Sequence, residues 1–174
     1  MGARRGIVAF ALVAALCMGA AADAAGDDDL SWPLHGKVTG HFGELRAGHA
    51  HEGLDIPVPA GTPIRAASTG KVVMRELQDG YGKYTCVAHT RVTTCYGHQS
   101  RFATKLGEMV GRGQVIGYVG STGNAPVNHL HFEVRLGTRP WGKPVNPMKF
   151  LPGAWRDPIA QAAARLSLSR RSPP

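Results

Sequence analysis

Short apolar runs alternate with turn residues along most of the chain, from residue 32 to about residue 151. Runs rich in Val, Ile, Tyr and Thr and bounded by Gly or Pro are typical of β-strands. The segments 71–75, 84–89 and 92–96 fit this description, as does a short apolar strand between the glycines of residues 111–120. Asp79-Gly80 is a hairpin-type dipeptide between two of these segments. Helical periodicity is almost absent before residue 155. The pattern therefore predicts an all-β fold.

The segment 129–135 alternates most regularly between apolar and polar side chains. Side chains two residues apart on a strand lie on the same face. One face of this predicted strand therefore carries Leu130, Phe132 and Val134. The opposite face carries His129, His131 and Glu133. Two imidazoles can thus enter one site from a single strand, although an isolated pair of this kind is usually two surface histidines.

The first 24 residues have the organisation of a secretory signal peptide. Arg4 and Arg5 precede an apolar run at residues 7–18, and small residues surround cleavage sites near Ala22 or Ala24. The run is shorter than the roughly 20 residues that span a bilayer. An uncleaved anchor and a lipoprotein signal at Cys17 are the alternatives. We expect an exported protein, periplasmic or secreted, without a transmembrane segment after cleavage.

The remaining chain divides into a short leader at residues 25–31, one domain at residues 32–152 and a tail at residues 153–174. The full length of 174 residues fits a single domain. A composition of 43% hydrophobic and 18% charged residues excludes a disordered chain. In the tail, Asp157 and Pro158 can begin a short C-terminal helix over residues 159–166. Disorder after Pro152 is the equally open alternative.

The charge and the cysteines add two expectations. A formal net charge of +8 favours an anionic partner. Signal cleavage removes Cys17 and leaves Cys86 and Cys95, which flank a predicted two-residue turn at Thr90-Arg91. This turn places the two cysteines directly opposite each other, at a Cα separation that a disulfide accepts. In an oxidising compartment we expect them to be paired; two free thiols are the alternative.

A second group of polar residues has the composition of a metal site. His51 and Asp55 lie four residues apart, but Gly53 between them argues against a helix. We expect a turn or bulge that folds the carboxylate back towards the imidazole. Two neutral imidazoles and a carboxylate suit zinc, and three protein ligands with one open position are typical of catalytic zinc. His51, Asp55 and His131 would form such a set.

Further motifs surround these residues in a fixed order. They are His51-x-Gly53-x-Asp55, the loop at 59–63, Tyr96-Gly-His98, the glycine-rich segment 115–123 and the segment 128–133. Together they resemble the lysostaphin-type (LytM-type) zinc metallopeptidase family over residues 32–151. Phe42-Gly43 with Arg46 also resembles that family's opening Phe-Gly-x-Arg segment, with one additional residue before the arginine.

The resemblance implies a compact antiparallel β-sheet or sandwich with an active-site groove over one sheet. The family's zinc ligands map to His51, Asp55 and His131, and its two non-ligand active-site histidines map to His98 and His129. Members cleave peptide stems or cross-links in bacterial peptidoglycan with one zinc ion. Some members have broken metal sites and activate other hydrolases. The alternative function is therefore a non-catalytic cell-wall binding or activator module, against which all five intact residues weigh.

The chemistry of these residues agrees with a hydrolase. Zinc can lower the pKa of a bound water to about 7 and polarise the scissile carbonyl. His98 or His129 can stabilise an oxyanion or pass a proton to the leaving amine, and the sequence leaves their division of labour open. We expect a monomer that binds peptidoglycan and no nucleic acid. An endopeptidase directed at ordinary proteins stays open.

Other histidines and acidic residues are weaker candidates. His35, His41 and His89 are expected to be surface or strand residues. His49 forms a second His-x-His pair with His51 and is an alternative ligand, which the following glycine and aspartate disfavour. Glu52 and Glu133 are expected to be solvated, with orientation of an imidazole as the alternative.

Overall fold

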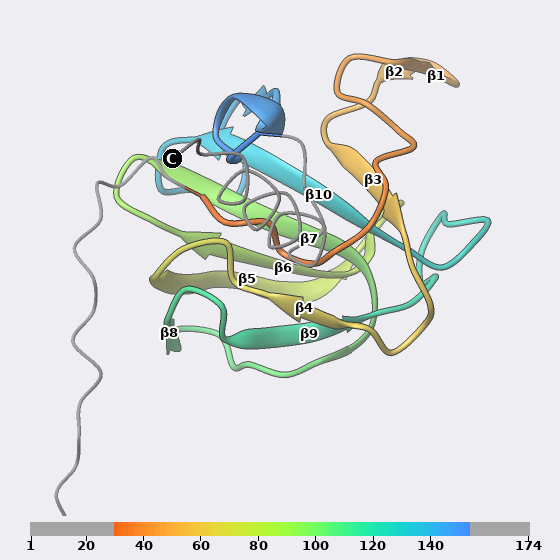
Figure 1. Ribbon diagram of the computed structural model, residues 1–174. Coiled ribbons are helices and arrows are strands. Elements are labelled where there is room, and N and C mark those ends of the chain that lie inside the picture. Colours follow the sequence, from red (N-terminus) through yellow and green to blue (C-terminus); the bar gives the residue numbers. More distant parts are fainter. Residues whose placement is uncertain (1–29, 154–174) are drawn as a thin grey trace, which may run out of the picture.

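The computed structural model describes residues 30–153, which form an antiparallel β-fold (Figure 1). The signal peptide expected at residues 1–24 and the C-terminal helix expected at residues 159–166 lie outside the described residues. The described elements are β1 (Leu45–Arg46), β2 (His49–Ala50), β3 (Leu54–Pro57), β4 (Pro63–Arg65), β5 (Gly70–Gln78), β6 (Gly82–Ala88), β7 (Val92–Phe102), β8 (Met109–Val110), β9 (Val115–Val119), β10 (His129–Leu136), β11 (Pro144–Val145) and the 3-10 helix η1 (Pro147–Lys149).

Nine of these strands form one sheet, and every pair in it is antiparallel. Its main path runs β11-β10-β7-β6-β5-β8, while β3 pairs with β10 and β9 bridges β4 and β7. The β1–β2 hairpin forms a separate ribbon that projects from the body near β3 (Figure 1). The predicted all-β, antiparallel fold is therefore confirmed. Within residues 30–153, no helix is long and apolar enough to cross a membrane.

The alternating segment 129–135 becomes β10, and its two faces have the predicted composition. Leu130, Phe132 and Val134 are completely buried in the main hydrophobic core. The polar face is buried too, so that only Leu136 at the end of the strand is exposed. A strand that is buried on both faces leaves its polar side chains little access to bulk water. These side chains must therefore find partners within the protein.

The domain begins slightly earlier than the sequence predicts. Leu30, expected in the short leader at residues 25–31, is 1% exposed and packs in the main core. Its amide donates to the carbonyl of Phe150 at 3.2 Å, and the next residue, Ser31, donates to the carbonyl of Ala67 at 2.8 Å. Burial of the leucine side chain thus attaches the start of the domain to its last described turn.

Cys86 on β6 and Cys95 on β7 form a disulfide across the two strands. They are directly opposite each other, as are Ala88 and Thr93, which is the register that a two-residue turn at Thr90-Arg91 predicts. Both cysteines are completely buried. They pack with Met74 and Tyr84 on the face of the sheet that also carries the polar side chains of β10.

We predict that the disulfide stabilises the domain by about 2–3 kcal/mol, because it closes a loop of nine residues in the unfolded chain. Urea unfolding of the oxidised protein, compared with a Cys86→Ala/Cys95→Ala double variant, measures this difference. Both proteins are assayed with a chelator so that bound metal does not contribute. Equal free energies of unfolding would contradict the prediction.

Candidate metal centre

The register between β3 and β10 brings two of the predicted metal ligands together. Asp55 on β3 pairs directly with His131 on β10, so their side chains project from the same face of the sheet. His51 precedes β3, and a bend at Gly53 returns it to the same point. The expected turn between His51 and Asp55 is therefore present as a bend, and the aspartate itself lies in a regular strand.

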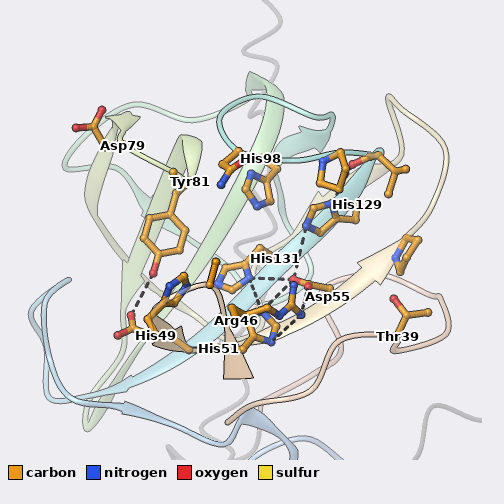
Figure 2. A pocket seen from close by; sticks show the side chains of 17 residues that line it. Thr39, Arg46, His49, His51, Asp55, Asp79, Tyr81, His98, His129 and His131 are labelled. Carbon is orange, nitrogen blue, oxygen red and sulfur yellow. Dashed lines mark hydrogen bonds and ion pairs between the residues drawn. The ribbon is translucent and has the colours of Figure 1, made fainter. Parts of the chain in front are cut away.

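Three ligand atoms converge at this point (Figure 2). Asp55 Oδ1 lies 3.1 Å from His51 Nε2 and 3.0 Å from His131 Nδ1, and the two nitrogens are 3.0 Å apart. In residues 30–153 this is the one group of at least three His, Cys, Asp or Glu side chains that is arranged to hold a metal ion.

The outer nitrogen of each imidazole is already engaged. His51 Nδ1 lies 2.9 Å from the carbonyl oxygen of His41, and His131 Nε2 lies 2.9 Å from Glu133 Oε1. Carbonyl and carboxylate oxygens only accept, so both outer nitrogens carry hydrogen. When the imidazoles are neutral, the remaining nitrogens, His51 Nε2 and His131 Nδ1, therefore direct lone pairs towards Asp55 Oδ1.

The donor set fits zinc. Zinc binds imidazole nitrogen and carboxylate oxygen at about 2.0–2.2 Å in a tetrahedron. The edges of such a tetrahedron are about 3.3 Å long, close to the observed separations of 3.0–3.1 Å between the ligand atoms. His51 and His131 are 5% exposed and Asp55 is 9% exposed, so the ligands are shielded while the fourth side faces a groove.

A proton occupies this site in the metal-free protein at neutral pH. Burial lowers the pKa of His131, but hydrogen bonds with Asp55 and Glu133 outweigh it and raise the pKa to about 9. For Asp55, burial acts in the opposite direction and raises the pKa, but hydrogen bonds from His131 and His51 hold the pKa well below its usual range. A metal cation must therefore displace a proton from the imidazole before it binds.

Arg46 holds the other oxygen of the aspartate, and the absence of a side chain at Gly40 leaves room for this contact. Arg46 Nη2 donates to Asp55 Oδ2 at 2.8 Å, which leaves Oδ1 for the two histidines. A Cβ atom on Gly40 would lie 2.5 Å from Asp55 Oδ2 and 2.6 Å from Arg46 Nη2. A side chain at Gly40 would therefore break this ion pair. The additional residue before Arg46 does not prevent the arginine from reaching the site.

His98 and His129 face the same groove and have the same tautomer. His98 Nδ1 lies 2.8 Å from the carbonyl oxygen of Thr122, and His129 Nδ1 lies 2.9 Å from that of Val127. Each Nδ1 therefore donates, and each ring lines the groove with its Nε2 side. The ring centroids are 4.5 Å apart, and His129 Nε2 lies 3.6 Å from Asp55 Oδ1. Burial lowers the pKa of His98 to about 4, so this imidazole is neutral at pH 7.

A β-bulge turns His98 towards the groove. Between the pairs Thr85–Tyr96 and Lys83–Gln99, two residues of β7, Gly97 and His98, lie opposite a single residue of β6. His98 has φ = 58° and is the one non-glycine residue in the described part of the chain with positive φ. Simple alternation would place its side chain beside Tyr96 in the main core. The bulge instead directs it to the metal face, as bulges commonly do beside sites.

The groove is open and has a volume of about 590 Å³. The five predicted site residues lie along it, and Figure 2 shows their side chains directed into a common space. Beyond these five, the lining includes Thr39, Arg46, His49, Glu52, Tyr81, Asn124 and Val127. The geometry therefore combines a three-ligand cation site with two further imidazoles and room for an extended substrate.

Residues 49–147, more than half of the chain, match the sequence profile of peptidase family M23. The chain belongs to peptidase family M23. The matched segment of this M23 protein contains all five site residues. The resemblance to lysostaphin-type enzymes is confirmed by the catalytic domain of lysostaphin from Staphylococcus simulans. That structure superposes with a TM-score of 0.62 at 31% identity, over 66% of this chain and 90% of the lysostaphin chain.

Two named relatives share only part of their length with this M23 chain. The DD-carboxypeptidase/endopeptidase Mpg of Neisseria meningitidis is 40% identical over 105 residues, 60% of this chain and 23% of Mpg. The peptidoglycan DD-endopeptidase ShyA of Vibrio cholerae is 39% identical over 100 residues, 57% of this chain and 22% of ShyA. The chain thus spans less than a quarter of either relative.

One expectation about neighbouring polar residues of the M23 domain is wrong. Glu133, expected to be solvated, is completely buried and accepts from His131. Glu52 is partly solvated, with 38% of its side chain exposed, and its carboxylate pairs with Arg135 and accepts from Tyr81 at 3.1 Å. The contact of Glu133 with His131 corresponds to the alternative, orientation of an imidazole. The partners of Glu52 are not visible in local sequence, because Arg135 and Tyr81 come from other parts of the chain.

The other histidines stay outside the ligand set. His49 is exposed on β2 and lines the groove, but it is not among the three convergent ligands. His89, expected as a surface or strand residue, is 8% exposed and lies between the carbonyl of Thr69 and the hydroxyl of Thr94, each at 2.9 Å. Tyr81 was missed by sequence reasoning; it follows the Asp79-Gly80 turn and lines the groove.

Gly53 provides a steric test of the site. A Cβ atom there would lie 2.4 Å from the carbonyl oxygen of Phe132 and 3.0 Å from two ring atoms of His131. We predict that Gly53→Ala displaces this imidazole, lowers zinc affinity at least tenfold and costs about 1–3 kcal/mol of stability.

Gly111→Ala is the matched control, because a Cβ atom there meets nothing within 4 Å and its φ is not positive. Chelator competition and urea unfolding of both variants provide the comparison. Equal zinc affinity in the two variants would refute the steric account.

The protonated metal-free site predicts a coupling between zinc and pH. Since the pKa of His131 is raised to about 9, zinc binding at pH 7.5 should release about one proton. The apparent affinity should rise about tenfold per pH unit and level off near pH 9. Calorimetric titrations in buffers of different ionisation enthalpy measure the number of protons, and release of none would contradict the prediction.

Proposed function

We propose that this M23 protein is an exported, zinc-dependent metalloendopeptidase that hydrolyses peptide bonds in the stems or cross-links of bacterial peptidoglycan. One observation supports the proposal most strongly. Three mutually close ligand atoms and two further imidazoles, each held by an Nδ1 contact with a backbone carbonyl, line the same open groove. A binding module would not require the two additional histidines.

The ligands of the zinc ion would be His51, Asp55 and His131. A bound zinc ion supplies a Lewis acid that polarises the scissile carbonyl and acidifies a water molecule. Arg46 holds the second carboxylate oxygen at 2.8 Å and so limits Asp55 to a single ligand atom. The fourth side of the site faces the groove, where the substrate would lie.

His98 and His129 would transfer the proton. Each Nδ1 donates to a backbone carbonyl, which fixes the ring and leaves an Nε2 lone pair in the groove. Such an imidazole accepts a proton from the attacking water and delivers it to the departing amine, so that a neutral peptide bond yields an acid and an amine. While protonated, the same Nε2–H donates to the oxygen that becomes negative during the attack. All five side chains come from one chain, which is consistent with a monomer.

The substrate class rests on the relatives and on the chemistry of the chain. Mpg is named a DD-carboxypeptidase/endopeptidase and ShyA a peptidoglycan DD-endopeptidase. The formal net charge of +8 favours attraction to the anionic cell wall. The disulfide is typical of proteins in oxidising compartments, which supports a periplasmic or secreted location.

The proposal predicts the release of soluble peptides from purified peptidoglycan and from defined muropeptides, identified by mass spectrometry. Chelation should abolish release, and stoichiometric zinc should restore it.

His131→Ala should lose both zinc and activity. His98→Asn, in which asparagine tolerates the positive φ, should keep zinc but lose about 10²–10⁴-fold in kcat.

His35→Ala is the matched control, because His35 is exposed and does not line the groove. Activity that persists in metal-free protein or in His131→Ala would refute the mechanism. Bound zinc without cleavage of any muropeptide would favour the activator function instead. Cleavage of casein in preference to muropeptides would refute the substrate class.

A further inference from the structure

The polar face of β10 continues beyond the metal ligand as a buried chain of charged residues. Glu133 and Arg135 follow His131 at intervals of two, and both point to the same face of the strand. Glu133 is completely buried, and Arg135 is 5% exposed. Neither residue lines the groove, so neither is placed to touch a substrate.

Every oxygen of the Glu133 carboxylate is engaged. Oε1 accepts from His131 Nε2 at 2.9 Å. Oε2 accepts from the Tyr84 hydroxyl and from Arg135 Nε, each at 2.6 Å. A buried carboxylate is costly unless it is paired and hydrogen-bonded, and here both conditions are met. The three donors hold the carboxylate in a single orientation against the imidazole.

The chain of contacts then returns to the segment that carries the other histidine ligand. Arg135 donates through Nη2 to Glu52 Oε2 and through Nη1 to the carbonyl of Gly142 at 3.2 Å. Glu52 is the neighbour of His51 in sequence, and it also accepts from the Tyr81 hydroxyl. The ion pairs from Glu133 to Arg135 and from Arg135 to Glu52 therefore link β10 to the segment just before β3.

We propose that Glu133 is a positioning residue for His131, and that Arg135 and Glu52 hold its carboxylate in place. By accepting from Nε2–H, Glu133 fixes the tautomer and rotation that direct the Nδ1 lone pair to the metal. Carboxylates that bond the outer nitrogen of a ligand histidine commonly act in this way. This inference rests on the proposed zinc function of His51, Asp55 and His131.

Glu133→Gln tests the proposal because it preserves the size of the side chain. Arg135 and Tyr84 both donate to Oε2, so the amide oxygen will occupy that place and its NH₂ group will face His131 Nε2. A donor there disfavours Nε2–H and favours the tautomer whose Nδ1–H points at the metal. We expect the zinc dissociation constant to rise about 10–100-fold. Chelator competition on the metal-free protein measures it independently of catalysis.

Thr85→Val is the matched control. Thr85 is also completely buried, but its side chain projects to the face of the sheet opposite Tyr84. The substitution removes one hydrogen bond, which Gln99 Nε2 donates to the threonine hydroxyl at 2.9 Å. Zinc affinity should be unchanged in this variant. If Glu133→Gln does not fold, Tyr84→Phe removes a single donor from Oε2 and should still weaken zinc binding several-fold.

A histidine ¹⁵N spectrum of the zinc-loaded protein gives a second readout. Wild type should show Nε2–H and a metal-bound Nδ1 for His131, and Glu133→Gln should lose this pattern. Folded Glu133→Gln with wild-type affinity and spectrum would overturn the positioning role. Wild type that binds no zinc would instead overturn the proposed function, while wild type that binds zinc without cleaving muropeptides would leave the positioning role standing.

Discussion

The backbone pairing of β3 with β10 is the constraint on which the rest of the site depends. Four residue pairs align the two strands, and one of them sets Asp55 opposite His131. Because opposed residues share a face with Cβ atoms about 4.5–5.5 Å apart, the ladder brings carboxylate and imidazole together without a metal. A slip of one residue would turn His131 to the apolar face and separate the ligands. The apolar face of β10 opposes that slip, since it would expose Phe132 to the polar side of the sheet.

Because β10 is buried on both faces, the same register also places its polar side chains away from bulk water. The apolar face contributes to the main core, whereas the polar face carries an imidazole, a carboxylate and a guanidinium away from water. Unpaired, such groups would strongly destabilise the fold. Their pairing in the order His131, Glu133 and Arg135 satisfies them and at the same time restrains the imidazole. Stability and the geometry of the metal site therefore depend on the same hydrogen bonds.

Much of this arrangement is predictable from local pattern. Alternation over residues 129–135 predicts both faces of β10, and a two-residue turn predicts the register of Cys86 with Cys95. The orientation of His98 is not predictable in this way, because the bulge that turns it depends on how β7 pairs with β6. The burial of Glu133 is missed for a related reason: its partner Tyr84 lies 49 residues away and meets it only when β6, β7 and β10 assemble. Motif order locates the site, whereas tertiary contacts decide how each side chain is held.

The metal centre proposed for this strand pair consists of two imidazoles and one carboxylate. X-ray absorption at the zinc edge of the zinc-loaded protein counts and identifies the ligand atoms. We expect only nitrogen and oxygen ligands at about 2.0–2.2 Å, with the scattering of two imidazoles. Sulfur at about 2.3 Å, or a third imidazole such as that of His49, would contradict this ligand set.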